Sequence, residues 1–286
     1  MRVETLSSTT EALTPAPSGK LIVPARSVGE CIAFSLVVPT RNESHNLGEL
    51  VELLTPALVS QVGDSYEIIV VDDNSPDGTW KVAAEMAARD PHVIAIRRVD
   101  ERGLATAVVR GWQASRGSML GVIDADLQHP PEVTAQLIAA MQQGADLAVA
   151  SREAEGGGTS DWCLPRLCIS RSLRALGKML LPDVLSMVSD PMAGFFVIRR
   201  AAVEDVELKP CGYKILVELL VRSRVRKIVE IGYVFRARQR GESKASLKVF
   251  TDYVQHLLRL RATVREMSAE PSLPELETKA MAASRE

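Results

Sequence analysis

Pairs of aspartates follow two apolar segments of the chain. One segment ends in Asp72 and Asp73, and another ends in Asp124 and Asp126, which are one residue apart. Carboxylates held this close repel each other unless a cation lies between them. Mg²⁺ and Mn²⁺ bind carboxylate and phosphate oxygens together, and such a metal would neutralise a diphosphate leaving group. The pattern predicts a metal and diphosphate site at Asp124 and Asp126, and a base or ribose contact at Asp72 and Asp73.

A structural interpretation competes with this chemistry. Residues 73–78 read Asp-Asn-Ser-Pro-Asp-Gly, which is typical of a tight turn. The chain also lacks the glycine-rich phosphate loop of ATP-binding proteins and the one that follows the first strand of dinucleotide-binding proteins. A bound nucleotide would therefore be held by carboxylates and metal, which points to a sugar nucleotide rather than to ATP or NAD.

Basic residues suited to a second phosphate occur further along the chain. Arg152 precedes three glycines, and Arg166 and Ser170 are four residues apart on an expected helix. Residues 238–244 gather two arginines, a serine and a lysine around a glycine. Guanidinium, hydroxyl and backbone N–H groups can together donate several hydrogen bonds to one phosphate. A solvated basic helix face and a polar surface turn are the structural alternatives.

Composition and charge exclude several classes of protein. The 286 residues carry a formal net charge of −2, which argues against general nucleic-acid binding. The four cysteines form no Cys-x-x-Cys pair, so reduced thiols are favoured over a zinc site. No run of about 18 apolar residues occurs. A membrane substrate would have to be met from the surface.

Apolar runs alternate with amphipathic stretches, and this order predicts the elements that position the charged residues. Strands are expected over residues 33–38, 67–71, 93–97, 119–123 and 146–150. Helices are expected over residues 46–58, 79–89, 104–115, 130–142 and 165–181. Alternating strands and helices indicate an α/β fold with a mostly parallel sheet covered on both faces. Ligands bind at the carboxyl ends of such strands, where the aspartates lie.

The two ends of the chain are expected to differ from the central domain. Residues 1–30 are rich in Ser, Thr, Pro and Ala and predict a disordered leader, and residues 268–286 predict a flexible tail. The catalytic domain is expected over residues 31–245. Residues 246–267 predict an amphipathic helix with arginines, which would either lie on an anionic bilayer or pack against its own domain.

Nine short motifs in this order resemble the family-2 glycosyltransferases, and within them the dolichol-phosphate mannose synthase and polyprenyl-phosphate glycosyltransferase type. The resemblance covers roughly residues 33–262. The motifs are Pro39-Thr-Arg-Asn-Glu, Val71-Asp-Asp-Asn-Ser-Pro-Asp-Gly, Gly103-Leu-Ala-Thr-Ala, Asp124-Ala-Asp-Leu-Gln-His-Pro, Ser151-Arg, Arg166 with Ser170-Arg, Asp190-Pro-Met-Ala-Gly-Phe-Phe, Gly212-Tyr-Lys-Ile-Leu-Val-Glu and Arg238-Gln-Arg-Gly-Glu-Ser-Lys.

This resemblance implies a Rossmann-like GT-A fold, a Mg²⁺ or Mn²⁺ cofactor and inversion at the sugar carbon. The implied donor-nucleotide contacts are Pro39, Arg41, Glu43, Asp73, Asp124 and Gln128. The implied metal ligands are Asp124, Asp126 and Gln128. The implied acceptor-phosphate contacts are Arg152, Arg166, Ser170, Arg238 and Lys244. Asp126 and Arg238 are the implied catalytic residues. The sequence departs from the family pattern in having Arg41 where tyrosine is usual, Glu153 in place of an aromatic residue, and no C-terminal membrane helices.

The function that we expect is transfer of a hexose, mannose from GDP-mannose first among the candidates, to a polyprenyl or dolichyl monophosphate. UDP-glucose as donor, and a soluble or polysaccharide acceptor, are the enzymatic alternatives. A catalytically silent nucleotide-sugar-binding module and a nucleotide-dependent oxidoreductase are weaker hypotheses. The protein is expected to be cytoplasmic and peripherally associated with a membrane, through residues 246–267 or a membrane-protein partner.

Overall fold

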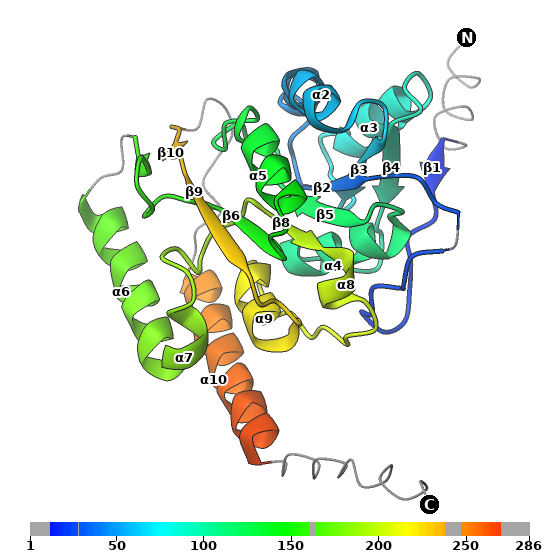
Figure 1. Cartoon of the computed structure of the whole chain (residues 1–286). Coiled ribbons are helices and arrows are strands. Elements are labelled where there is room, and N and C mark those ends of the chain that lie inside the picture. Colours follow the sequence, from blue (N-terminus) through cyan, green and yellow to red (C-terminus); the bar gives the residue numbers. More distant parts are fainter. Residues whose placement is uncertain (1–11, 28, 161–163, 238–246, 270–286) are drawn as a thin grey trace, which may run out of the picture.

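An eight-stranded, mostly parallel sheet forms the centre of the computed structural model, which describes residues 12–27, 29–160, 164–237 and 247–269 (Figure 1). The strand order is β1-β4-β3-β2-β5-β8-β6-β9, with β8 antiparallel to both of its neighbours. The strands are β1 (Leu13–Thr14), β2 (Phe34–Thr40), β3 (Tyr66–Asp72), β4 (Val93–Arg97), β5 (Met119–Val122), β6 (Leu147–Ser151), β8 (Phe196–Arg199) and β9 (Ile228–Gly232). A small second sheet pairs β7 (Gly158–Thr159) with β10 (Val234–Phe235).

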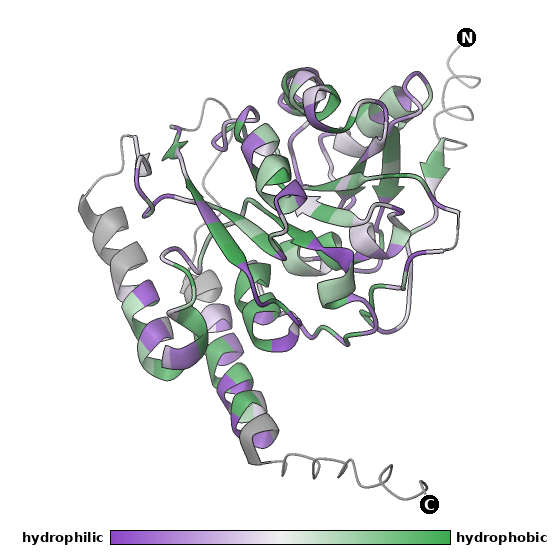
Figure 2. Ribbon diagram, in the orientation of Figure 1, coloured by the Kyte–Doolittle hydropathy of each residue, from purple (hydrophilic) through white to green (hydrophobic). Residues whose placement is uncertain are grey.

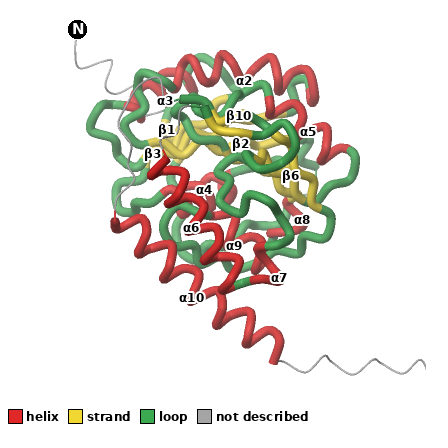
Figure 3. The backbone as a smooth tube through the Cα atoms, turned by 90° about the vertical axis from the view of Figure 1, so that its left-hand side faces the viewer, coloured by secondary structure: helices red, strands yellow, loops and turns green. Residues whose placement is uncertain are grey.

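Helices cover both faces of this sheet (Figure 3). One face carries α2 (Leu47–Val62), α3 (Thr79–Ala87) and α5 (Val133–Gln142). The other carries α4 (Leu104–Ala114), α6 (Leu164–Leu180), α7 (Pro182–Leu185), α8 (Arg200–Val203), α9 (Ile215–Arg222) and α10 (Leu247–Ala269). All residues of β2 and β3 are buried, and their mostly apolar sequences suit strands buried on both sides. Figure 2 shows this hydrophobic interior.

The expected α/β fold is therefore confirmed, and the first five long strands lie close to their predicted ranges. Strand β2 continues through Pro39 to Thr40 rather than ending before the proline. A proline lacks the N–H needed for one ladder. It is tolerated because β5 pairs with β2 only as far as Val37, and at Pro39 the remaining neighbour is β3.

The N-terminal segment corrects one expectation, because residues 12–27 are packed on the domain; we call them the N-terminal strap. Strand β1 pairs with β4 at the edge of the sheet. Val23 is completely buried in the core. The Gln113 amide donates hydrogen bonds to the carbonyl groups of Lys20 (2.8 Å) and Ile22 (2.9 Å). The prediction of a disordered leader is wrong for these residues, while residues 1–11 lie outside the described part.

Helix α10 packs against its own domain. Tyr253, Leu257 and Leu260 are buried in the same core as α4 and α9. The His256 ring also lies 2.8 Å (Nε2 to Oε2) from the buried carboxylate of Glu218 on α9. Among the described helices none is long and apolar enough to cross a membrane. Residues 270–286, where a tail was expected, lie outside the described part.

Candidate donor and acceptor site

The loop after β5 carries the second aspartate pair. Asp126 and Gln128 are almost fully buried, whereas the side chain of Asp124 is 32% exposed. Between them Leu127 has a φ of 59°, a left-handed conformation that branched residues rarely adopt. The Gln128 N–H donates to Asp126 Oδ1 (3.2 Å). This turn holds three oxygen-bearing side chains at the carboxyl end of the sheet, as the sequence predicted.

The residues of this loop fit a hard divalent cation that takes its remaining ligands from water and from substrate phosphates. No group of three or more His, Cys, Asp or Glu side chains suited to a metal ion occurs in the described ranges. Asp124 and Asp126 therefore offer a two-carboxylate site, and Mg²⁺ in particular binds through one or two carboxylates together with water and substrate phosphates. The Gln128 amide nitrogen donates to the carbonyl of Arg236 (3.0 Å), so its amide oxygen is the atom that could reach a metal.

An aromatic wall that sequence reasoning did not assign lies beside Asp124. His129 is buried, its Nε2 lies 3.6 Å from Asp124 Oδ2, and its Nδ1 lies 2.9 Å from the Tyr233 hydroxyl. The His129 ring also contacts Phe195 and Phe235 edge-on. Burial raises the pKa of the Tyr233 phenol, so the hydroxyl stays protonated in its contact with His129 Nδ1.

Arg152, a predicted acceptor-phosphate contact that directly follows β6, is close to this wall. Its guanidinium lies 5.7 Å from the Phe235 ring centroid and binds Asp190 through two hydrogen bonds, Nε to Oδ2 (2.6 Å) and Nη2 to Oδ1 (2.9 Å). Burial would raise the pKa of Asp190, but the hydrogen bond and charge of Arg152 lower it. Tyr233 lies within electrostatic reach of Asp124, Asp126, Asp190 and Arg152. Because Phe235 contacts the His129 ring, whose Nε2 lies 3.6 Å from Asp124, the structure places Arg152 on the same aromatic wall as this predicted donor aspartate.

Glu230 on β9 holds the loop that carries Asp190 in place through hydrogen bonds. Its carboxylate accepts hydrogen bonds from the Ser189 N–H (2.9 Å) and the Ser189 hydroxyl (2.7 Å). The Ser189 hydroxyl also lies 2.8 Å from that of Ser151, the residue before Arg152. The end of β6, the middle of β9 and the loop that carries Ser189 and Asp190 therefore determine where the Arg152 guanidinium lies.

Lys214 is a further cation of the site that received no role from the sequence. Its ammonium donates to the Met192 carbonyl (2.6 Å) and lies within electrostatic reach of Arg152, Asp190 and Asp124. Burial, assisted by the nearby Arg152, lowers the pKa of Lys214 to about 8. The motif Gly212-Tyr-Lys-Ile-Leu-Val-Glu contains Lys214 and could have drawn attention to it. The motif does not reveal which residues surround Lys214 in space.

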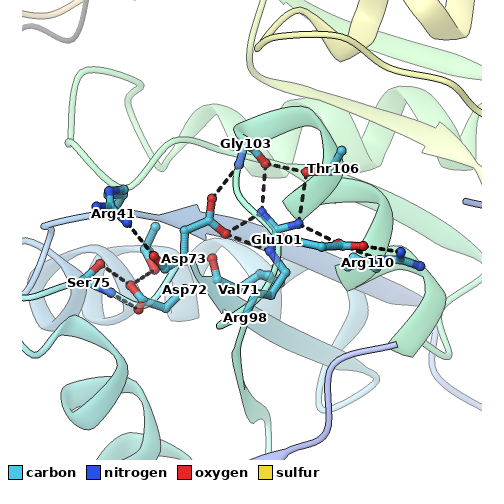
Figure 4. Close-up of polar contacts among 11 residues, drawn as sticks. Arg41, Val71, Asp72, Asp73, Ser75, Arg98, Glu101, Gly103, Thr106 and Arg110 are labelled. Atoms are coloured by element: carbon cyan, nitrogen blue, oxygen red, sulfur yellow. Dashed lines mark hydrogen bonds and ion pairs between the residues drawn. The ribbon is translucent and has the colours of Figure 1, made fainter. Parts of the chain in front are cut away.

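Both members of the first aspartate pair are buried, but they have different hydrogen-bond partners (Figure 4). Asp72 is completely buried and accepts hydrogen bonds from Thr40 Oγ1 (3.0 Å) and from the N–H (2.8 Å) and hydroxyl (2.5 Å) of Ser75. These bonds stabilise the turn after β3, so the suggested base or ribose contact at Asp72 is wrong and the turn interpretation holds for it. Asp73 sits beside it with its side chain 8% exposed.

The remaining predicted nucleoside residues surround Asp73. Pro39 lies in β2, and Arg41 donates from Nη1 to the Asp73 carbonyl (2.5 Å). Glu43 is buried and accepts a hydrogen bond from the Asn46 amide (2.8 Å), while its N–H donates to Thr79 Oγ1 (2.9 Å). All four residues lie at the carboxyl ends of β2 and β3, as the sequence predicted.

Part of the predicted acceptor cradle cannot be compared with the structure. The backbone of Arg166 and Ser170 belongs to α6, but their side chains lie outside the described part. Arg238 and Lys244 fall within residues 238–246, which are likewise outside it. Arg174, on the same helix as Arg166, forms an ion pair with Glu153.

The sequence matches the model of glycosyl transferase family 2 over residues 35–206, more than half of the chain. The chain belongs to glycosyltransferase family 2. This family-2 chain is 44% identical over 226 residues to a dolichol-phosphate mannosyltransferase of Pyrococcus furiosus, an alignment that covers 79% of the chain and 63% of that relative, less than two thirds of its length. It is 34% identical to a dolichol-phosphate mannosyltransferase of Saccharomyces cerevisiae, covering 80% of the chain and 87% of the relative.

Another relative is a polyprenol monophosphomannose synthase of Mycolicibacterium smegmatis, 34% identical over 223 residues, with 74% of the chain and 80% of the relative covered. Among solved structures, glucosyl-3-phosphoglycerate synthase from Mycobacterium tuberculosis, in complex with Mn²⁺, UDP and glucosyl-3-phosphoglycerate, has a TM-score of 0.59 at 19% identity and covers 88% of this chain and 87% of its own. This likeness supports the GT-A fold.

Proposed function

We propose that the protein transfers mannose from GDP-mannose to a polyprenyl or dolichyl monophosphate, with inversion at the anomeric carbon. Three relatives at 34–44% identity carry the names dolichol-phosphate mannosyltransferase or polyprenol monophosphomannose synthase. The observation that carries the proposal is the position of the Arg152 guanidinium, 5.7 Å from the Phe235 ring, which contacts the His129 ring beside Asp124. An acceptor phosphate bound there would lie next to the donor diphosphate.

The chemistry that this arrangement supports is direct displacement of the nucleoside diphosphate by the acceptor phosphate. A phosphate monoester is anionic at neutral pH, so its oxygen needs no strong general base. It needs cations that hold it close to a second anion. Arg152, kept in place by Asp190, supplies one such cation. The predicted contacts Arg166, Ser170, Arg238 and Lys244 would complete the cradle.

The donor half of the reaction belongs to the aspartates. Asp124, Asp126 and the amide oxygen of Gln128 would hold Mg²⁺ or Mn²⁺, which when bound supplies positive charge for the diphosphate leaving group. Asp73, with Pro39, Arg41 and Glu43, would contact the nucleoside. The phenol of Tyr233, which remains protonated, lies 2.9 Å from His129 Nδ1 and helps to hold the His129 ring beside Asp124.

Contact with the membrane is part of the proposal. The lipid chain of the acceptor lies in a bilayer, and α10 offers the exposed Leu258 (53%) beside its buried face. We infer that the protein works at the cytoplasmic surface of the membrane, either directly or through a membrane-protein partner. Transfer from UDP-glucose, or to a soluble acceptor, is the second candidate, since the Mn²⁺-bound structural neighbour named above contains UDP.

A transfer assay tests this function. Radiolabelled GDP-mannose or UDP-glucose is incubated with Mn²⁺ and either a polyprenyl phosphate or a simple sugar, and lipid-linked product is counted. We expect product from GDP-mannose with the lipid phosphate. We expect Asp126→Ala to lower turnover by roughly 10³-fold, since metal stabilisation of leaving-group charge contributes several kcal/mol.

The matched control is Asp64→Ala, which removes an exposed carboxylate outside the site and is expected to be fully active. Full activity of Asp126→Ala in chelator-treated buffer would contradict the metal assignment. Transfer to simple sugars alone would favour the second candidate.

A further inference from the structure

A row of four alternating charges runs from the predicted donor site to the N-terminal strap. Its members are Asp73, Arg98, Glu101 and Arg110, which we call the charged row (Figure 4). The side chains of Arg98 and Arg110 are only 2% and 3% exposed, while Glu101 is 42% exposed. Buried guanidinium groups are unfavourable unless they are paired. Such a row is therefore expected to have a defined geometry.

Arg98 determines the orientation of the Asp73 carboxylate. Its Nε donates to Asp73 Oδ1 (2.7 Å), and its Nη2 donates to the same oxygen and to the Gly103 carbonyl (2.9 Å). Its Nη1 donates to Thr106 Oγ1 (3.0 Å), so all three guanidinium nitrogens are engaged. The other oxygen of Asp73, Oδ2, accepts the Gly103 N–H (2.7 Å). The carboxylate is thus fixed at both oxygens.

The outer half of the row holds Arg98 in turn. Glu101 accepts hydrogen bonds from Arg110, at 2.9 Å from Nε and 2.5 Å from Nη2, and lies 3.3 Å from Arg98 Nη1. Arg110 Nη2 also donates to the carbonyl of Gly19 in the N-terminal strap (3.0 Å). Contacts therefore run without interruption from the strap to Asp73.

We propose that Arg98 is a positioning residue for Asp73 in the donor site, and that Glu101 and Arg110 anchor it to the N-terminal strap. This inference rests on the proposed function, in which Asp73 contacts the donor nucleoside. Without Arg98 the carboxylate can rotate away from the nucleoside. Its charge, no longer compensated, also repels the donor diphosphate. Both effects weaken donor binding and leave the acceptor site intact.

A double-mutant cycle on Arg98 and Asp73 tests the proposal. Donor and acceptor KM and kcat are measured for Arg98→Met, Asp73→Asn and the double variant, with GDP affinity determined by calorimetry. We expect each single change to raise the donor KM about tenfold to a hundredfold, the size expected for lost hydrogen bonds to a charged group. If Arg98 acts through Asp73, the double variant is no worse than the worse single variant. The acceptor KM stays unchanged.

Losses that add in the double variant, or a raised acceptor KM, overturn the proposal. Arg98→Lys keeps the charge without the planar fork and is expected to recover part of the donor affinity, which keeps the test decisive if Arg98→Met does not fold. Glu101→Gln should have a smaller effect of the same kind, whereas Glu52→Gln, an exposed change on α2, should have none. Failure of the wild-type chain to bind GDP would instead count against the proposed function.

Discussion

Lys214 is the ionisable group of the site whose charge is most sensitive to mild alkaline pH. Its pKa is lowered to about 8, first by burial and then by Arg152. The group is therefore charged at neutral pH and loses its proton within the range in which enzymes are commonly assayed. Because the unfolded chain keeps this lysine protonated to a higher pH, its contribution to the free energy of unfolding becomes more favourable as pH rises from about 8 toward 10.5.

Activity is expected to respond in the opposite direction. The Lys214 ammonium lies in reach of Asp124, which belongs to the proposed diphosphate site. Deprotonation of Lys214 therefore removes positive charge near the donor diphosphate. We expect the donor KM to rise several-fold between pH 7 and pH 9.5, since each pKa unit corresponds to about 1.4 kcal/mol. Lys214→Arg should flatten that profile because arginine stays protonated.

Donor KM values across this pH range, measured with saturating Mg²⁺, check the prediction. Lys209→Arg provides the matched control, since the Lys209 side chain is 62% exposed and should leave the profile unchanged. A donor KM of the wild-type protein that does not change with pH would contradict a role of Lys214 in donor binding.

Single residues were predictable from the sequence where local chemistry was unusual. Asp124, Asp126 and Arg152 are charged residues that come at or just after the ends of apolar strands, and this position makes them recognisable in the sequence. Tyr233 and Asp190 were not assigned a role, because their importance comes from neighbours more than 30 residues away in the chain, such as Arg152 to Asp190. Asp72 carries the same local signal as Asp73, and its three hydrogen bonds to Thr40 and Ser75 could not be read from the sequence.

At the scale of elements, the order of the first strands and helices and their mostly parallel arrangement were predictable from hydrophobic periodicity, whereas the antiparallel strand β8 was not. Strand β8 is antiparallel between β5 and β6, and no pattern within Phe196–Arg199 specifies its direction. Strand β9 and helix α9 were also not predicted. The loops between these later elements carry Asp190 and Lys214. Sequence motifs contain both residues, but their contacts with Arg152 and Met192 became known only from the fold.

Glu230 on β9 offers a test of how one strand positions the acceptor side. Glu230→Gln replaces a carboxylate that accepts two hydrogen bonds from Ser189 by an amide with one acceptor oxygen. We expect the free energy of unfolding to fall by about 1–2 kcal/mol, the size of a lost hydrogen bond with an unpaired partner. The loop that holds Asp190 should loosen, so the acceptor KM should rise several-fold through Arg152 while the donor KM changes little.

Thermal unfolding and the two KM values measure these effects. Glu85→Gln, an exposed change on α3, is the control and should shift neither. An unchanged acceptor KM together with the lowered stability would mean that Glu230 stabilises the fold and has no effect on acceptor binding.

At the scale of the whole molecule, the N-terminal strap joins regions that are far apart in sequence. It pairs with β4 through β1, and its Pro24 carbonyl accepts a hydrogen bond from Arg200 on α8 (3.0 Å). The sequence of the strap predicted disorder, because backbone carbonyls make most of its contacts and leave no apolar periodicity. Val23 is buried in the core, and Ala12, Leu13 and Leu21 are partly buried against it.

Val23→Ala tests whether the strap matters for both stability and donor binding. Removing two buried methyl groups is expected to lower the free energy of unfolding by about 1–3 kcal/mol. The donor KM should rise a few-fold, because a loosened strap offers Arg110 a less fixed Gly19 carbonyl. Chemical denaturation and donor kinetics provide the two readouts.

Val99→Ala makes the same chemical change at a residue that is 57% exposed and should alter neither property. A Val23→Ala protein with reduced stability but wild-type donor kinetics would show that the strap does not influence donor binding through the charged row.

The place of β1 at one end of the strand order also concerns encounters between molecules. Without Leu13 and Thr14, the backbone groups of Ala95 and Ile96 on β4 would form an open parallel edge. Open edges recruit strands from other chains and promote aggregation. A fusion partner or affinity tag that pulls the strap off β4 would therefore create a self-associating surface, and tags are better attached at the opposite end of the polypeptide.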